Sequence, residues 1–301
     1  MWKKLGRVYV PDNNYPWMKT HANNTIAEHL QGDVFRVYFS CRDIDNQSSI
    51  GYVDVNISPP FKILGISSKP VLVRGEPGLF DDSGVTLACM VNVGNRKFLY
   101  YLGWNLGVTV PMRNFIGLAV YNENSRQFKK VSKAPLLDRC EEDPYCLSYP
   151  FVLKDGGTYR MWYGSNLSWG KEQKDMAHVI KYAESRDGIH WTREGRIALE
   201  FKNDREYAMS RPWVIKENDV YKMWYSYRGD SYRIGYAESP DGLQWTRKDE
   251  LAGIDVSSEG WDSESVEYPF LFDHKGRRYM LYNGNAYGKT GFGLAVLEHN
   301  L

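Results

Sequence analysis

The chain repeats a short proline-centred phrase at long and nearly equal intervals. Its three copies begin at residues 149, 211 and 268 and read Tyr-Pro-Phe, Arg-Pro-Trp and Tyr-Pro-Phe, with Met-Trp-Tyr or Met-Leu-Tyr following each. The prolines are 62 and then 57 residues apart. A second phrase, Tyr-Ala-Glu-Ser-x-Asp-Gly-x-x-Trp, occurs at residues 182–191 and 236–245. Repetition at this period is typical of a radial or linear array of one supersecondary unit.

The copy that begins at residue 211 shows the content of one repeat. Residues 212–216 alternate apolar and polar side chains, and Asn218-Asp219 separates them from a second run at 220–227. A third run at 233–238 and a fourth at 244–247 are separated by Pro240-Asp241-Gly242. Asn-Asp and Asp-Gly are typical of hairpin turns, so each repeat is predicted to contain four short antiparallel strands.

Two weaker copies precede the three clear ones. Residues 21–30, 34–40 and 50–56 form one, and residues 83–93, 97–104 and 115–121 form the other. The sequence therefore predicts an all-β fold, a five-bladed β-propeller that fills residues 1–301 as one domain, with blades starting near residues 20, 82, 148, 209 and 266. The last blade has three strands of its own, and we expect residues 8–10 to complete it. A linear solenoid is the competing architecture.

Composition excludes several function classes. The net charge of +1 gives no electrostatic reason to bind nucleic acid or an anionic membrane. Residues 1–7 lack the apolar run of a signal peptide, and no stretch has the length of a membrane-spanning helix. The four cysteines lack zinc-type spacing, which favours a reduced, cytoplasmic protein. No cofactor is indicated, and the oligomeric state is left open.

Strand direction predicts the functional face. In each repeat, neighbouring strands run in opposite directions. The first strands therefore begin, and the second strands end, on the same face of the molecule. The loops that join second to third strands, and fourth strands to the next first strand, lie on this face too. The catalytic candidates on that face are Asp43, Asp82, Glu206 and Glu267. The substrate-binding candidates are His21, Arg42, Trp104, Arg113, Tyr149, Arg211, Arg228, Glu264 and Asn285.

Acids, arginines and aromatic rings around one concave mouth are typical of a carbohydrate site. Aromatic rings pack against the apolar face of a sugar, and charged side chains bind its hydroxyl groups. Crowded carboxylates raise one another's pKa, which supplies the protonated acid and the ionised partner that glycosidic cleavage uses.

Glu267 is the acid that the repeat itself singles out. It precedes Tyr268-Pro269, where the matching positions of the sister repeats hold Ser148 and Ser210. A carboxylate in place of a small polar residue is better explained by a local function than by the repeat. Arg211 differs in the same way one residue further along, where the sister repeats hold tyrosine.

The remaining acids have structural alternatives. Asp82 could belong to the turn before a strand, and Asp43 could pair with Arg42 at a strand end. Glu206 and Glu264 could be solvated loop charges.

A metal is not predicted, although a small oxygen-rich site is conceivable. His21, Asp43 and Asp82 could supply its ligands, but nothing in their spacing requires one. His21 is equally well explained as a hydrogen-bonding residue without a ligand.

These features together resemble the five-bladed propeller glycoside hydrolases, which include the arabinanase/xylosidase, invertase-like and mannosyl-phosphorylase families. The resemblance covers the whole chain and rests on the strand starts and the Asp-Gly turns described above. The segments 80–85, 211–213 and 260–264 are also similar to uncharacterised bacterial glycosidase-like proteins associated with surface-polysaccharide genes.

The resemblance implies acids in the first three blades, and this sequence departs from that pattern. Asp82 fits the position in blade two. Blade one has His21-Ala22-Asn23-Asn24 where an aspartate is expected, although Asp43 reaches the same face. Blade three has no obvious catalytic glutamate. Either the acids have moved to Asp43, Glu206 and Glu267, or the reaction differs.

The resemblance and the candidate site predict a glycoside hydrolase that acts on a surface-polysaccharide or related sugar. Glu267 or Glu206 would be the general acid, and Asp82 or Asp43 the base or nucleophile. The four arginines would bind an acidic or phosphorylated sugar. The first alternative is a phosphate-dependent phosphorylase, in which arginines and His21 hold phosphate. A carbohydrate-binding propeller without catalysis is the second, and isomerase or lyase chemistry stays open.

Overall fold

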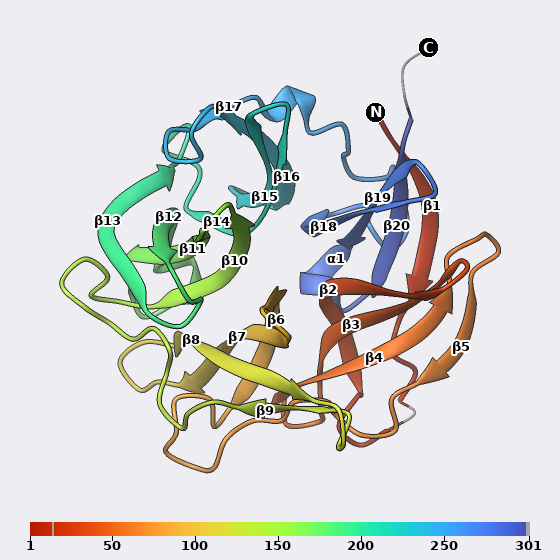
Figure 1. The fold of residues 1–301 in the computed structure, drawn as a ribbon, viewed down its shortest axis with the longest axis horizontal. Helices are drawn as coiled ribbons and strands as arrows, with labels where there is room; N and C mark the ends of the chain where they lie inside the picture. Colours follow the sequence, from red (N-terminus) through yellow and green to blue (C-terminus); the bar gives the residue numbers. More distant parts are fainter. Residues whose placement is uncertain (14, 299–301) are drawn as a thin grey trace.

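The computed structural model describes residues 1–13 and 15–298, and nearly all of its regular structure is β-strand (Figure 1). The strands form two sheets of eight strands and one of four. None of the short helices among the described residues has the length and hydropathy of a membrane-spanning segment.

The elements follow one another in sheet order. The first sheet contains β2 (Thr20–Gln31), β3 (Val34–Arg42), β4 (Ser48–Asn56), β5 (Lys62–Ile66), β6 (Gly84–Val93), β7 (Arg96–Leu106), β8 (Met112–Asn122) and β9 (Gln127–Lys130). The second contains β10 (Leu147–Asp155), β11 (Thr158–Ser168), β12 (Ala177–Ser185), β13 (Trp191–Leu199), β14 (Ala208–Glu217), β15 (Val220–Arg228), β16 (Tyr232–Ser239) and β17 (Thr246–Arg247). The third contains β18 (Glu267–His274), β19 (Arg277–Asn283), β20 (Phe292–Leu297) and β1 (Trp2–Tyr9). The helices are η1 (Gln173–Asp175), η2 (Asp249–Leu251) and the irregular α1 (Asn285–Gly288).

Each eight-stranded sheet consists of two antiparallel groups of four strands. The groups meet at a single parallel residue pair, Ser48 with Gly84 in the first sheet and His178 with Ala208 in the second. The first strands of the groups begin at residues 20, 84, 147, 208 and 267, each within two residues of the predicted start. The all-β prediction is confirmed.

The first strands enclose a central axis. β2 packs against β6, β6 against β10, β10 against β14, β14 against β18, and β18 against β2 (Figure 1). This closed ring of contacts excludes the linear solenoid. β1 lies antiparallel beside β20, with Trp2 opposite Leu297 and Tyr9 opposite Phe292. The N-terminal segment therefore completes the third sheet as predicted, although the strand spans Trp2–Tyr9 rather than residues 8–10.

The proline phrases produce matching bulges at the start of three first strands. Pairing is interrupted after Ser148, Ser210 and Glu267 and resumes three residues later. The next residue in each case has a positive φ: 39° at Tyr149, 52° at Arg211 and 57° at Tyr268. A bulge bends its strand and changes the direction of a side chain, which is how these positions leave the regular inward and outward alternation.

The aromatic residues that follow these prolines pack around the axis. The Trp213 ring lies 4.6 Å from that of Phe151 and 4.3 Å from that of Phe270, measured between centroids, and it contacts all three hydrophobic clusters of the core. The repeated phrase therefore supplies the packing that holds the sheets together below the candidate site.

Candidate functional site

A cavity of about 310 Å³ opens on the predicted face of the ring. Its wall is built from the ends of second strands, where Arg42, Trp104 and Asn166 lie, and from the starts of third strands. Ser48, Asn114 and His178 lie opposite these three residues, whereas Tyr232 lies opposite Arg228. The third-strand residues on the wall are Ser48, Asn114, His178 and Tyr232. Strand direction alone had indicated this face, and the lining residues agree with it.

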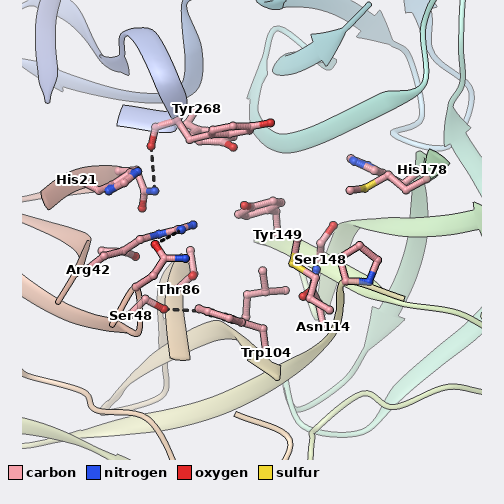
Figure 2. A pocket seen from close by; sticks show the side chains of 18 of the residues that line it. His21, Arg42, Ser48, Thr86, Trp104, Asn114, Ser148, Tyr149, His178 and Tyr268 are labelled. Carbon is pink, nitrogen blue, oxygen red and sulfur yellow. Dashed lines mark hydrogen bonds between the residues drawn. The ribbon is translucent and has the colours of Figure 1, made fainter. Parts of the chain in front are cut away.

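Four of the predicted substrate-binding residues lie on the cavity wall, namely His21, Arg42, Trp104 and Tyr149. Figure 2 shows Trp104 beside Ser48 on one side of the cavity and Tyr268 across from them. The Trp104 Nε1–H donates to the Ser48 hydroxyl over 2.8 Å, which fixes the indole ring at the wall. An aromatic ring held in this way offers a flat apolar surface to a sugar.

Arg42 is the charged residue of the wall. Its Nη1 donates to the Asn46 side-chain oxygen over 2.7 Å, and among the described residues no carboxylate forms an ion pair with it. The neighbouring His21 is held near Thr20, with 2.8 Å between Nδ1 and the hydroxyl oxygen. Burial, together with the positive charges of Arg42 and Lys289, lowers the pKa of His21 to about 4, so its ring is neutral at pH 7.

The cavity wall contains no aspartate or glutamate among the described residues. Glu267 lies next to it, at the start of β18, and its side chain is fully buried. Neither carboxyl oxygen has a hydrogen-bond partner among the described residues. Burial raises the pKa of Glu267 to about 8, even though the charge of Arg228 and the nearby backbone N–H of Tyr287 oppose the shift. The carboxyl group is therefore mostly protonated at pH 7.

A cluster of tyrosines separates Glu267 from the open cavity. Tyr149, Tyr232, Tyr268 and Tyr287 all line the wall, and the rings of Tyr149 and Tyr268 lie 5.6 Å apart. Burial, and then the nearby Glu267 carboxyl group, raise the pKa of Tyr232 well above its usual value. Phenol rings and hydroxyl groups thus cover the buried acid.

A second hollow of about 270 Å³ adjoins the cavity and shares Met176, His178, Tyr232 and Tyr287 with it. Arg228 lines this hollow, with its guanidinium carbon 5.4 to 5.6 Å from the centres of three tyrosine rings, and it donates to the Tyr287 hydroxyl.

Three of the four predicted catalytic acids have local structural contacts away from the cavity wall. Asp43 accepts the backbone N–H groups of Asp45 and Gln47 in a turn. Asp82 accepts the N–H of Gly78 and the hydroxyl of Ser83.

Glu206 is neutralised by an arginine. Its two oxygens accept from Arg247 over 2.6 and 3.0 Å, and one of them also accepts the Lys202 N–H over 2.9 Å. Asp43, Asp82 and Glu206 therefore do not line the cavity, and each is held by its own loop or by an ion pair.

The other predicted binding residues also lie off the wall. Arg211 is fully buried and donates to the carbonyl oxygens of Ala88 and Thr25, so it connects first strands. Asn285 accepts the backbone N–H groups of Glu264 and Ser265, while the Glu264 side chain is exposed. Arg113 is half-buried on β8.

Sequence reasoning missed His178 and Tyr232. Aligning the second repeated phrase would have paired them, since each stands four residues before Tyr-Ala-Glu-Ser. The predicted third strand began at residue 233, one residue too late to include Tyr232.

The alternative metal site from His21, Asp43 and Asp82 does not form. The described residues contain no group of three or more His, Cys, Asp or Glu side chains arranged to hold a metal ion. All four cysteines are free thiols, including Cys140 and Cys146.

Comparison with known proteins shows which protein family this chain belongs to. No protein-family model matches the sequence. The uncharacterized protein Rv1502 of Mycobacterium tuberculosis is 49% identical over 298 residues, which cover 99% of each chain. The chain belongs to the same protein family as Rv1502.

Solved structures show a similar fold at low sequence identity. A glycoside hydrolase covers 97% of this chain and 90% of its own, with a TM-score of 0.73 and 18% identity. A second structure comes from the GH130 family of mannoside phosphorylases, a family described as containing glycoside hydrolases that target β-1,2 mannosidic linkages in Candida mannan. The match covers 99% of this chain and 94% of that one, with a TM-score of 0.69 and 18% identity. The predicted resemblance to the propeller glycosidases is thereby confirmed.

Proposed function

We propose that this protein is a glycan-active enzyme of the glycoside hydrolase type, with the cavity as its substrate site and Glu267 as its general acid. The observation that carries the proposal is a fully buried carboxyl group, without a hydrogen-bond partner among the described residues and with a pKa of about 8, beside an aromatic cavity. An ordinary glutamate has lost its proton at pH 7. A carboxylic acid kept neutral can protonate the oxygen of a leaving group.

The wall of the cavity supports a sugar as the ligand. Trp104 and Tyr149 offer ring faces, and Ser48, Asn114 and Asn166 offer hydroxyl and amide groups. Glu267 has no exposed surface, so proton donation requires a wall tyrosine to relay the proton or to move aside. Catalytic hydrogen bonds commonly tighten only when substrate binds.

The architecture proposed for this site is a single five-bladed propeller. The antiparallel groups of four strands, their single-pair parallel junctions and the ring of first strands support this count. A surface-polysaccharide sugar as substrate and a cytoplasmic location stay predictions of the sequence.

The test is the substitution Glu267→Gln, assayed on a panel of aryl glycosides. We expect kcat/KM to fall about 10²- to 10⁴-fold for a poor leaving group. The loss should be much smaller for a dinitrophenyl leaving group, which departs without protonation. Glu194→Gln, an exposed glutamate away from the cavity, is the matched control. Unchanged turnover in Glu267→Gln would remove the proposed acid.

Phosphorolysis is a second candidate, and Arg42 favours it. The cavity contains this arginine without a carboxylate partner and has no aspartate or glutamate on its described wall. Bound phosphate would act as the nucleophile, so a second carboxylate would not be needed. Turnover that requires inorganic phosphate and releases a glycosyl phosphate would establish this reaction. Equal turnover in phosphate-free buffer would favour hydrolysis. Calorimetric binding of a sugar that stays intact would instead indicate a binding protein.

A further inference from the structure

His178 lies where the two hollows meet. It is the second residue of β12, its side chain is largely buried, and it belongs to the walls of both hollows. Figure 2 shows it on the side of the cavity opposite His21 and Arg42. It is a titratable group on the wall that the proposed acid does not account for.

The hydrogen bonds of His178 determine which ring nitrogen carries the proton. Nδ1 lies 2.6 Å from the carbonyl oxygen of Met209. A carbonyl oxygen only accepts, so Nδ1 is the protonated nitrogen and donates this bond. Burial lowers the pKa of the imidazole to about 4, so the ring is neutral at pH 7. Nε2 therefore has a free lone pair and can accept a proton from a bound molecule.

The structural contact that His178 makes does not require a histidine. At the matching junction of the first sheet, Ser48 donates its backbone N–H to Ser83 and its hydroxyl to the carbonyl oxygen of Val85, over 3.4 and 3.0 Å. His178 likewise uses its backbone N–H and one side-chain donor to connect its strand to the next group. A serine performs this role with fewer atoms, so the second ring nitrogen is not explained by the junction.

The His178 imidazole is about as basic as the carboxylate that usually serves as general base in inverting glycosidases. Inverting glycosidases use a carboxylate to deprotonate water, and an ordinary carboxylate has a pKa of about 4. The His178 imidazole has a pKa of about 4 as well. Unlike a carboxylate, it adds no negative charge to a cavity that contains the unpaired Arg42.

We propose that His178 is the general base of this site and works together with Glu267; the proposal rests on the glycoside-cleaving function above. Nε2 takes a proton from a water molecule as the water oxygen bonds to the anomeric carbon. The bond from that carbon to the leaving oxygen breaks. The leaving oxygen takes the Glu267 proton, either relayed by a wall tyrosine or passed directly once that tyrosine has moved aside. Imidazolium and carboxylate then exchange protons with solvent, and the net change is the addition of one water.

The first experiment needs no substrate. Nitrogen-15 spectra of histidine-labelled protein, with the His178 signals assigned by their loss in His178→Asn, should show protonated Nδ1 and unprotonated Nε2 at pH 7. This state should persist to about pH 5, given the pKa of about 4. A proton on Nε2 at pH 7, in either the other tautomer or the imidazolium, would overturn the proposal.

The second experiment separates a base from a structural residue. In His178→Asn the amide N–H can still donate to Met209, so we expect the melting temperature to be preserved and hydrolysis to fall about 100-fold. Azide should restore cleavage and yield a glycosyl azide, because azide attacks without losing a proton. Wild-type activity in the variant, or a loss that azide does not repair, would contradict the base assignment.

The two proposals fail in different ways. Glu267→Gln should respond to a better leaving group and not to azide, whereas His178→Asn should respond to azide. If the wild-type protein cleaves a glycoside and His178→Asn cleaves it equally well, the base is wrong and the acid stands. If Glu267→Gln alone keeps full activity, the assignment of Glu267 as general acid is wrong.

Discussion

At the scale of single residues, the partner of a buried acid decides what that acid can do. Glu206 and Glu267 are both buried glutamates on the same side of the ring. Arg247 binds both oxygens of Glu206, so that side chain is held in an ion pair. Glu267 has no such partner, and burial leaves it neutral. The same residue type therefore has a structural role at one site and is available as a proton donor at the other.

Glu267 gives a prediction about stability and pH. Its pKa rises from the ordinary 4.5 to about 8 on folding, so between these pH values the unfolded state has released a proton that the folded state keeps. Wild-type stability should therefore fall as the pH rises through this range. Glu267→Gln lacks this titration, so its unfolding free energy relative to wild type should increase from pH 5 to pH 8. Urea unfolding at several pH values measures it, and a constant difference would contradict the raised pKa.

At the scale of elements, the second repeated phrase forms a turn that joins one repeat to the previous one. Asp241 Oδ1 accepts the N–H groups of Leu243 and Gln244 over 2.8 and 2.9 Å. The turn then presents the Gly242 carbonyl oxygen to the indole N–H of Trp162, a residue of the preceding repeat, over 2.9 Å. Gly242 has a φ of +76°, which a side chain disfavours. Trp162 thus connects its own group of strands to the next one, on the face opposite the cavity.

Asp241→Ala tests this turn. The backbone N–H groups that bind the carboxylate lower the pKa of Asp241, so its contribution is present above its ordinary pKa and is lost as the pH falls through the folded-state value. We expect a loss of about 1 kcal/mol of unfolding free energy at pH 7, and a smaller loss in acid. Activity should not change. Asp230→Ala, another exposed aspartate, is the control, and equal stability of the two variants at pH 7 would refute the role of the turn.

At the scale of the whole molecule, closure of the ring depends on the N-terminal strand. β1 covers the edge of β20, and Trp2 reaches the neighbouring sheet, where its ring lies 6.3 Å from that of Trp224 in an edge-on arrangement. An uncovered strand edge would be open to pairing with other chains. Residues from opposite ends of the sequence thus complete one sheet and join it to the next.

Trp2→Ala should destabilise the whole ring. Removing a large buried aromatic side chain costs about 3–5 kcal/mol, and Trp2 is only 7% exposed. Urea unfolding followed by circular dichroism measures the loss. Lys3→Ala is the matched control, because Lys3 is exposed and pairs with Glu298 at the surface, where such pairs contribute about 0–1 kcal/mol. A loss in Trp2→Ala no larger than that in the control would show that closure does not depend on this contact.

The repeat predicted most of the fold because its signals are local. Alternating side chains and Asp-Gly turns fix strands and hairpins within a few residues, and the strand starts agree within two positions. The sequence also showed that Glu267 is unusual, since the matching positions of the other two repeats hold serine. Which acids meet at the cavity was not visible. The Arg247 partner of Glu206 lies 41 residues away. Arg193 and Arg247 both follow the Trp-Thr that ends the second phrase, but this local pattern does not say which acid each arginine meets.

Sequence alone determined the all-β array, the position of its repeats and the face on which first strands begin, because each follows from short-range periodicity and strand direction. Tertiary structure decided the chemistry of that face. It gave Asp43, Asp82 and Glu206 hydrogen-bond or ion-pair partners, and it buried Glu267 without one. The bond from Nδ1 of His178 to Met209 leaves Nε2 of that ring as a proton acceptor. The physical reason is that proton affinity depends on desolvation and on neighbouring charges, and both are set only when distant segments come together.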